Sequence, residues 1–204
     1  MNRLCAFLLL IVLAVSLRAA EDPSSDKFES VKKRYASAKM IDLGVDIIVV
    51  SDVFDDVDTS QGRILITDDG RYFAGLENDI YLFDGRCIWE YSAENNQATK
   101  KCLKENQGFE SRLIFVKNLD QHYATSVVKA DSVYHLSRLD DSDDSLPDSL
   151  TVYLGRNGLS SVEYYDLNGD LNRVRVVYET VMDFISEEFF EINLPDSVEI
   201  ISLP

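Results

Sequence analysis

The chain has 204 residues, 46% of them hydrophobic, and its 36 acidic residues outnumber the 20 basic ones to give a net charge of −16. So negative a chain argues against nucleic-acid binding, because few cations are available to neutralise phosphates, and it disfavours adsorption to anionic lipid surfaces. The length suits one domain, and self-repulsion of this size favours a soluble protein that we expect to be a monomer.

Residues 1–20 are typical of an export signal peptide. Arg3 supplies a short positive region, and the apolar stretch Leu4–Leu17 is too short to span a bilayer comfortably. Ala19–Ala20 offers a small-residue cleavage site, and no cysteine follows it for lipid attachment. We therefore expect residues 21–204 to be a single exported domain in the periplasm, with a retained anchor helix as the alternative.

The next stretch predicts one helix and then strands. Ser25-Asp26 can cap a helix that runs to about Ala38, with Phe28, Val31 and Tyr35 on one face. From Met40 onward the apolar residues recur every second position, which is the period of a half-buried strand. The sequence therefore changes from helix to strand at this point.

The stretch from Ile80 to Leu103 predicts three strands joined by two turns. Asp84-Gly85 marks a tight turn, and Ala93–Asn96 is a short polar loop. Folding the last two strands back on each other around that loop places Cys87 opposite Cys102. A disulfide between these cysteines is expected in an oxidising compartment, with two buried thiols as the alternative.

The rest of the chain continues mainly as strands. Ser111–Asn118 is apolar and fits either a short helix or a strand, whereas Asn157-Gly158 and Asn168-Gly169 are hairpin turns. The count reaches about eleven strands in consecutive antiparallel order, for which a single curved sheet is the simplest arrangement. The helices are the available covers for its apolar face.

Several motifs together resemble the periplasmic outer-membrane lipoprotein carrier proteins, the LolA-like family. The central motif is a strand ending in Asp-Gly, followed by a bulky residue, Trp, Tyr and a Gln-x-Thr pattern. The residues that carry it are Asp84, Gly85, Ile88, Trp89, Tyr91, Gln97 and Thr99. Similar order and spacing recur near the C-terminus at Asp166–Asn172, Val174, Val176, Tyr178, Phe189, Phe190, Pro195 and Val198–Ile200.

The resemblance implies a mainly β fold, a half-open antiparallel β-barrel of about eleven strands with helices covering its concave face. It also implies a chaperone that takes acylated lipoproteins from an inner-membrane exporter, shields their acyl chains across the periplasm and delivers them to an outer-membrane acceptor. No cofactor is implied. Asp68 and Asp69 replace the family's basic-Pro pair, so the family's basic latch on the lid is not carried over, and Arg71 is not assigned to it.

Strand alternation and the resemblance together nominate a lipid-binding face, gated by the N-terminal helix and Ser111–Asn118. The alternative is that the same residues form an ordinary packed core. The nominated residues are Val45, Ile47, Val49, Ile64, Ile66, Tyr72, Leu76, Trp89, Tyr91, Leu113, Ile114 and Phe115.

Other functional classes find weaker support. Asp166–Asn172 carries scattered oxygen ligands but lacks the spacing of a calcium loop, so a hairpin turn explains it better and no metal site is predicted. No nucleophile motif, phosphate loop or metal cluster appears, so no catalytic residue is nominated, although a paired-carboxylate carbohydrate-active enzyme remains an alternative. The other alternative is a lipid- or lipoprotein-sensing interaction module on the same half-barrel.

Overall fold

The computed structural model describes residues 23–51, 53–103, 119–139 and 146–203. One helix, α1 (Pro23–Ser37), precedes six strands: β1 (Met40–Ser51), β2 (Asp56–Thr67), β3 (Tyr72–Leu76), β4 (Asp79–Phe83), β5 (Cys87–Ser92) and β6 (Gln97–Cys102). The short helix α2 (Leu119–His122) leads into β7 (Tyr123–Lys129), β8 (Val133–Arg138), β9 (Ser149–Leu154), β10 (Leu159–Tyr165) and β11 (Leu171–Met182). The chain then forms the 3-10 helix η2 (Glu187–Phe190) and the strand β12 (Glu199–Leu203).

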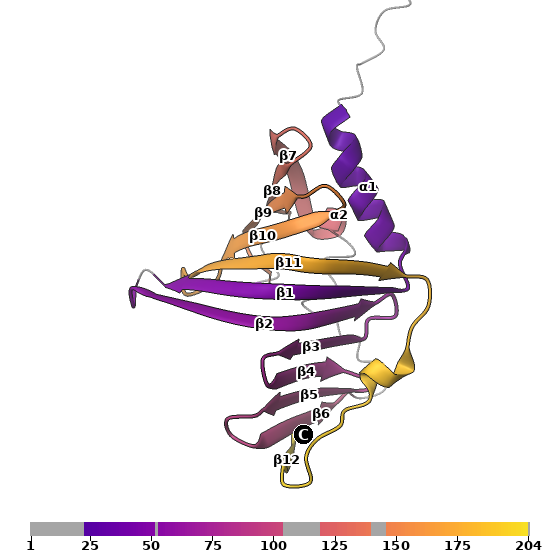
Figure 1. The fold of residues 1–204 in the computed structure, drawn as a ribbon, viewed down its shortest axis with the longest axis vertical. Helices are drawn as coiled ribbons and strands as arrows, with labels where there is room; N and C mark the ends of the chain where they lie inside the picture. The colour runs from indigo at the N-terminus through magenta and orange to yellow at the C-terminus, as the bar shows by residue number, and fades with distance from the viewer. Residues whose placement is uncertain (1–22, 52, 104–118, 140–145, 204) are drawn as a thin grey trace, which may run out of the picture.

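The described strands form one open sheet in the order β12-β6-β5-β4-β3-β2-β1-β11-β10-β9-β8-β7 (Figure 1). The predicted fold class, an unclosed and mainly antiparallel β structure with a helix on one face, is confirmed. The predicted consecutive order of the strands is wrong in two places. β11 pairs with β1, and β12 joins β6 in the parallel direction. Because the first seven residues of β1 are buried, this strand needs hydrogen-bonding partners on both of its edges, and β2 alone supplies only one.

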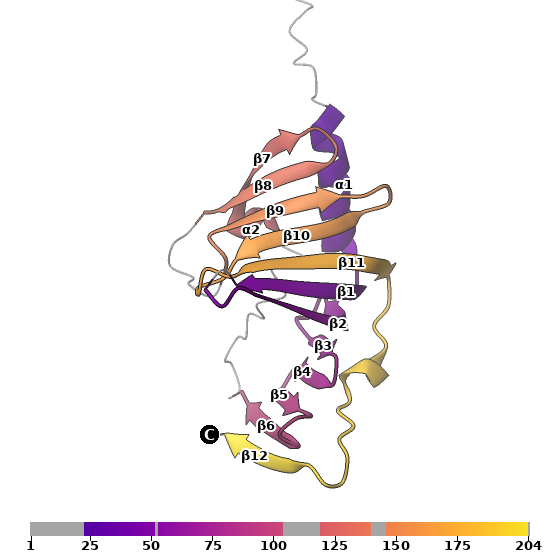
Figure 2. The ribbon, with the colours of Figure 1, turned by 60° about the vertical axis from the view of Figure 1, so that its left-hand side comes forward.

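The two faces of the sheet have different covers. We call the face that α1 packs on the helix face, and the other, which packs against the segment containing η2, the outer face (Figures 1 and 2). Alternate residues of each strand belong to opposite faces. On β1, Ile41, Leu43 and Val45 belong to the cluster around α1, whereas Met40 belongs to the cluster around Phe190 of η2. The predicted helix is confirmed, and its Phe28, Val31 and Tyr35 are all buried.

The β5–β6 hairpin has the predicted register. Cys87 lies opposite Cys102 and the two are joined by a disulfide, while Trp89 lies opposite Lys100. The preceding turn is organised by Asp84, whose carboxylate accepts hydrogen bonds from the backbone N–H of Cys87 at 2.7 Å and from the Trp89 indole at 3.2 Å. Gly85 follows with a φ of 93°, a conformation that favours glycine. The predictions of the turn, the register and the disulfide are therefore confirmed.

Candidate functional site

A cavity of about 510 Å³ lies between α1 and the helix face. Its lining is mostly apolar and comes from both helices, from strands on both sides of the β1–β11 pair, and from two connecting segments. The lining residues are Phe28, Val31, Lys32, Tyr35, Leu43, Val45, Ile64, Ile66, Leu119, Leu146, Pro147, Asp148, Leu150, Val152, Leu159, Val162, Tyr164, Tyr165, Asp166, Leu167, Asn168, Val174 and Val176.

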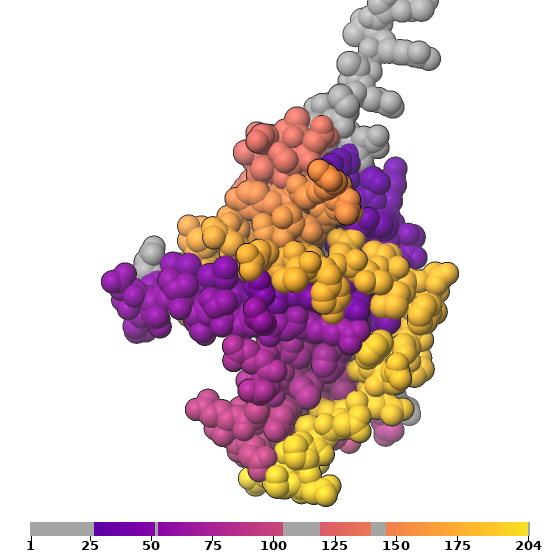
Figure 3. Space-filling view, in the orientation of Figure 1, coloured from indigo at the N-terminus to yellow at the C-terminus, as the bar shows by residue number. Residues whose placement is uncertain are grey.

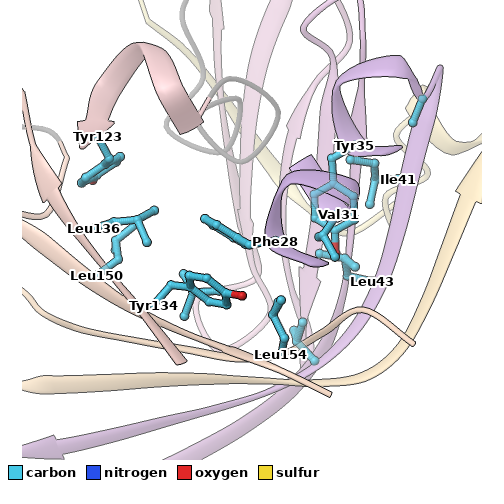
Figure 4. Close-up of a cluster of buried hydrophobic side chains, with 13 residues drawn as sticks. Phe28, Val31, Tyr35, Ile41, Leu43, Tyr123, Tyr134, Leu136, Leu150 and Leu154 are labelled. Atoms are coloured by element: carbon cyan, nitrogen blue, oxygen red, sulfur yellow. The ribbon is translucent and has the colours of Figure 1, made fainter. Parts of the chain in front are cut away.

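α1 forms one wall of the cavity through the apolar stripe that its sequence predicts. Phe28 stacks on Tyr134 of β8 with ring centroids 4.6 Å apart, and Val31 and Tyr35 follow on the same face of the helix (Figure 4). Residues at i, i+3 and i+7 lie on one side of a helix. The helix thus offers the cavity a continuous apolar side.

The sheet curls to form the remaining walls. Val45 lies on β1 and Val152 on β9, with β11 and β10 between them in the sheet, yet both line the same cavity. Neighbouring strands lie about 4.8 Å apart, so a flat sheet would hold these two strands about 14 Å apart and unable to face each other. The curvature therefore makes the apolar helix face concave around the cavity.

One carboxylate fastens the C-terminal end of α1 to the sheet. Glu179 of β11 forms an ion pair with Arg34 and accepts a hydrogen bond from the Tyr35 hydroxyl at 2.7 Å. It also accepts a hydrogen bond from the Leu159 backbone N–H at 3.3 Å, while Arg34 donates to the Asn157 carbonyl at 3.0 Å. Burial and the hydrogen bond to Glu179 raise the pKa of Tyr35 well above its usual value.

A second polar contact holds the middle of α1 beside the cavity. Lys32 forms ion pairs with Glu29 of the same helix at 2.7 Å and with Asp120 of α2. Burial acts to lower the pKa of Lys32, but the hydrogen bonds to Asp120 and Glu29 outweigh it and raise the pKa. Lys32 therefore remains a cation and places one charged group in an otherwise apolar wall.

The structure brings most of the nominated strand residues to the helix face. Val45, Ile64 and Ile66 line the cavity, and Ile47 and Leu76 pack against the same cluster. Val49 and Tyr72 share this face through their register, because Val49 pairs with Asn172 and Tyr72 pairs with Ile66.

The structure does not bring Trp89 and Tyr91 into this cavity. Counting across the paired strands from Ile66 on the helix face, Tyr72, Phe83 and Ile88 share that face, so the neighbouring Trp89 points to the outer face. There Trp89 packs in the cluster around Leu82 and η2, and the Lys100 ammonium lies 4.4 Å from its ring centroid. Tyr91 shares the outer face, and Leu113, Ile114 and Phe115 lie outside the described residues.

Much of the lining was absent from the sequence prediction. Leu150 and Val152 on β9, Leu159 and Val162 on β10, and Val174 and Val176 on β11 line the cavity together with Leu43. A signal was present, because Leu150, Val152 and Leu154 alternate with Thr151 and Tyr153 as a half-buried strand should. What the sequence lacked was the pairing of β11 with β1, which carries these strands to the same face as Val45.

No family profile and no curated protein sequence matches the chain. Among solved structures, an uncharacterised conserved protein from Thermus thermophilus is similar at a TM-score of 0.51 and 8% identity, covering 88% of this chain and 99% of its own. A LolA superfamily protein from Nitrosomonas europaea has a TM-score of 0.42 at 10% identity, over 83% of this chain and 98% of its own. A Vibrio parahaemolyticus domain described as a candidate for outer membrane lipoprotein sorting has a TM-score of 0.40 at 10% identity, over 82% and 97%.

These similarities concern the fold. The fold is shared with the Thermus protein, whose TM-score exceeds 0.5. Within the described part of the chain, no helix has the length and apolar character needed to cross a membrane.

Proposed function

We propose that this protein is a periplasmic carrier that holds the acyl chains of lipoproteins in the cavity under α1. The observation that carries the proposal is the cavity itself, about 510 Å³ with walls made mainly of apolar side chains. This volume lies within the range of about 300–1,000 Å³ that is usual for small-molecule sites. A packed core of the same residues would leave no such space.

The energetics of the cavity suit a carrier. Burying an acyl chain gains about 0.8 kcal/mol per CH₂, so one long chain is worth on the order of ten kcal/mol. A closed apolar wall can supply this, and a wall that opens can return the chain to a membrane or an acceptor. α1 is suited to be that movable wall. Polar side-chain contacts made by Glu179 and Lys32 hold it in place, and such contacts can break and form again as the helix moves.

The wider setting follows from the same proposal. Residues 1–20 would direct export and residues 21–204 would form the carrier domain, without a cofactor or a catalytic step. The partners would be an inner-membrane exporter that loads the cavity and an outer-membrane acceptor that empties it. Trp89 and Tyr91 are not part of the proposed lipid site, since they belong to the outer face.

The test begins with the protein purified from periplasm under native conditions. Native mass spectrometry should detect a co-purifying acylated species, and a fluorescent acyl probe should bind the emptied protein. Val162→Trp would fill part of the cavity and should weaken probe binding by about tenfold or more, since a blocked pocket loses most of the apolar burial.

Val177→Trp is the matched control. Val177 is 62% exposed. It is the unpaired residue of a bulge in β11, because Gly44 of β1 pairs with Tyr178 and Val45 pairs with Val176. The same substitution there should leave the cavity intact. If the protein purifies empty and binds no acyl probe, the proposal is refuted and the apolar helix face is an ordinary packed core. Equal binding by the two variants would remove Val162 and its neighbours from the site.

A further inference from the structure

The end of the β1–β2 hairpin carries large apolar side chains in solvent. Val53 is 76% exposed, Phe54 79% and Val57 60%. The hairpin end projects beyond the neighbouring strands in the space-filling view (Figure 3). Exposed apolar residues that gather in one place are a common mark of an interaction site, whereas single ones are not.

The turn between β10 and β11 extends this surface. Tyr165 is 63% exposed and Leu167 is 90% exposed. Tyr165 pairs with Leu171, Leu171 pairs with Val50, and Val50 pairs with Val57, so one row of apolar residues crosses β10, β11, β1 and β2 on the outer face. We call Val53, Phe54, Val57, Tyr165 and Leu167 the tip patch.

Two residues of the tip patch border the cavity. Tyr165 and Leu167 line the cavity and also stand in solvent, so they belong to both surfaces. A molecule seated on the patch would therefore lie beside the cavity.

The negative charge around the tip patch indicates which kind of partner could bind there. Asp55, Asp56 and Asp58 are exposed among the apolar residues of the hairpin end, and the segment 53–58 contains no Lys or Arg. An anionic membrane would repel these carboxylates, and a neutral bilayer would have to strip them of water without offering a counter-charge. A protein surface with cations around an apolar pocket satisfies both features and would also steer the encounter.

We propose that the tip patch is a docking surface for a partner protein whose own surface combines Lys or Arg side chains with an apolar pocket that takes Phe54. The docking does not depend on what the cavity holds. It goes beyond the carrier function by assigning a specific part of the fold to protein recognition.

The proposal can be tested on the full mature chain with a synthetic amphipathic peptide of leucine and lysine, beside a leucine–glutamate peptide of the same length. The variant Phe54→Ser with Asp58→Asn removes one apolar anchor and one charge from the patch. The control Ile200→Ser with Glu94→Gln likewise replaces one apolar residue with serine and one carboxylate with its amide, on β12 and the β5–β6 loop, where both residues are exposed.

The chain should bind the lysine peptide in a salt-dependent manner and the glutamate peptide much more weakly. The tip variant should lose about tenfold in affinity, as expected for a buried aromatic anchor, and the control should lose no more than about twofold. The thermal midpoints of both variants establish that they are folded, and their unchanged binding of an acyl probe would separate this result from the carrier function.

Two results would overturn the proposal. Equal losses in the two variants, or none in either, would mean that the peptide senses only net charge. Binding of phosphatidylcholine vesicles that disappears in the tip variant, with peptide binding intact, would assign the patch to a membrane instead.

Discussion

Tyr35 of α1 donates a hydrogen bond of 2.7 Å to Glu179 of β11, a residue 144 positions further along the chain. The same carboxylate pairs with Arg34, so two consecutive side chains at the end of the helix converge on one acceptor. The position of α1 over the cavity therefore depends strongly on Glu179.

Replacing Glu179 with alanine should loosen α1. The Tyr35 hydroxyl and the Arg34 guanidinium would lose their shared acceptor, and a buried group without a partner costs about 1–3 kcal/mol. The free energy of unfolding should fall by about 2 kcal/mol in denaturant titrations, and amides of α1 should exchange faster in hydrogen–deuterium exchange. Asp68→Ala removes the more exposed ion pair with Lys39 and should cost less than about 1 kcal/mol. Equal costs would contradict the special role of Glu179.

The stability of the protein should fall at high pH in a way that depends on Tyr35. Burial and the hydrogen bond to Glu179 raise the pKa of this tyrosine above its ordinary value of 10.0. Above about pH 10 the unfolded chain releases this proton while the folded chain keeps it, so the free energy of unfolding decreases by up to about 1.4 kcal/mol per pH unit from this group. Tyr35→Phe should lack this slope in titrations between pH 9 and 11. Parallel curves for the two proteins would show that Tyr35 ionises equally in both states.

Gly44 should not tolerate a side chain. A Cβ at this position would overlap the ring of Tyr178, which lies on the adjacent strand β11 and donates a hydrogen bond to Asp42 at 3.2 Å. Gly44→Ala should lower the free energy of unfolding by about 1–3 kcal/mol, the usual cost of overpacking. Gly155→Ala, whose Cβ would meet its nearest neighbour at an ordinary 3.5 Å, should change little. Thermal melts of the two variants compare them directly, and similar midpoints would argue against the close approach of β1 and β11.

The disulfide should stabilise the edge of the sheet that is formed by β5, β6 and β12. It closes a loop with a sequence separation of 15 residues, for which the chain-entropy account gives about 3 kcal/mol. Cys87→Ser with Cys102→Ser should therefore lower the free energy of unfolding by about that amount, and β6 with its parallel partner β12 should exchange amide hydrogens faster. Loss of acyl-probe binding without any change in stability would contradict a purely structural role, because both cysteines lie away from the cavity lining.

The sequence by itself determined several features that depend on neighbours along the chain. The spacing of Phe28, Val31 and Tyr35 predicted a helix with one apolar face, because residues three and four apart lie on the same side of a helix. The Ala93–Asn96 loop after Ser92 set the register of β5 on β6, and that register brought Cys87 opposite Cys102. The long alternation in β1 likewise predicted the face that holds Val45 and Ile47.

The tertiary structure decided which distant strands share a face. Nothing near Val45 in the sequence indicates that β11 pairs with β1, because that choice follows from burying both edges of β1 at once. The pairing brings Val152, Val162 and Val174 to the cavity, while the strand alternation turns Trp89 to the outer face. Hydrophobic burial is nondirectional, so the sequence shows that a residue will be buried, and only the packed sheet determines what it is buried against.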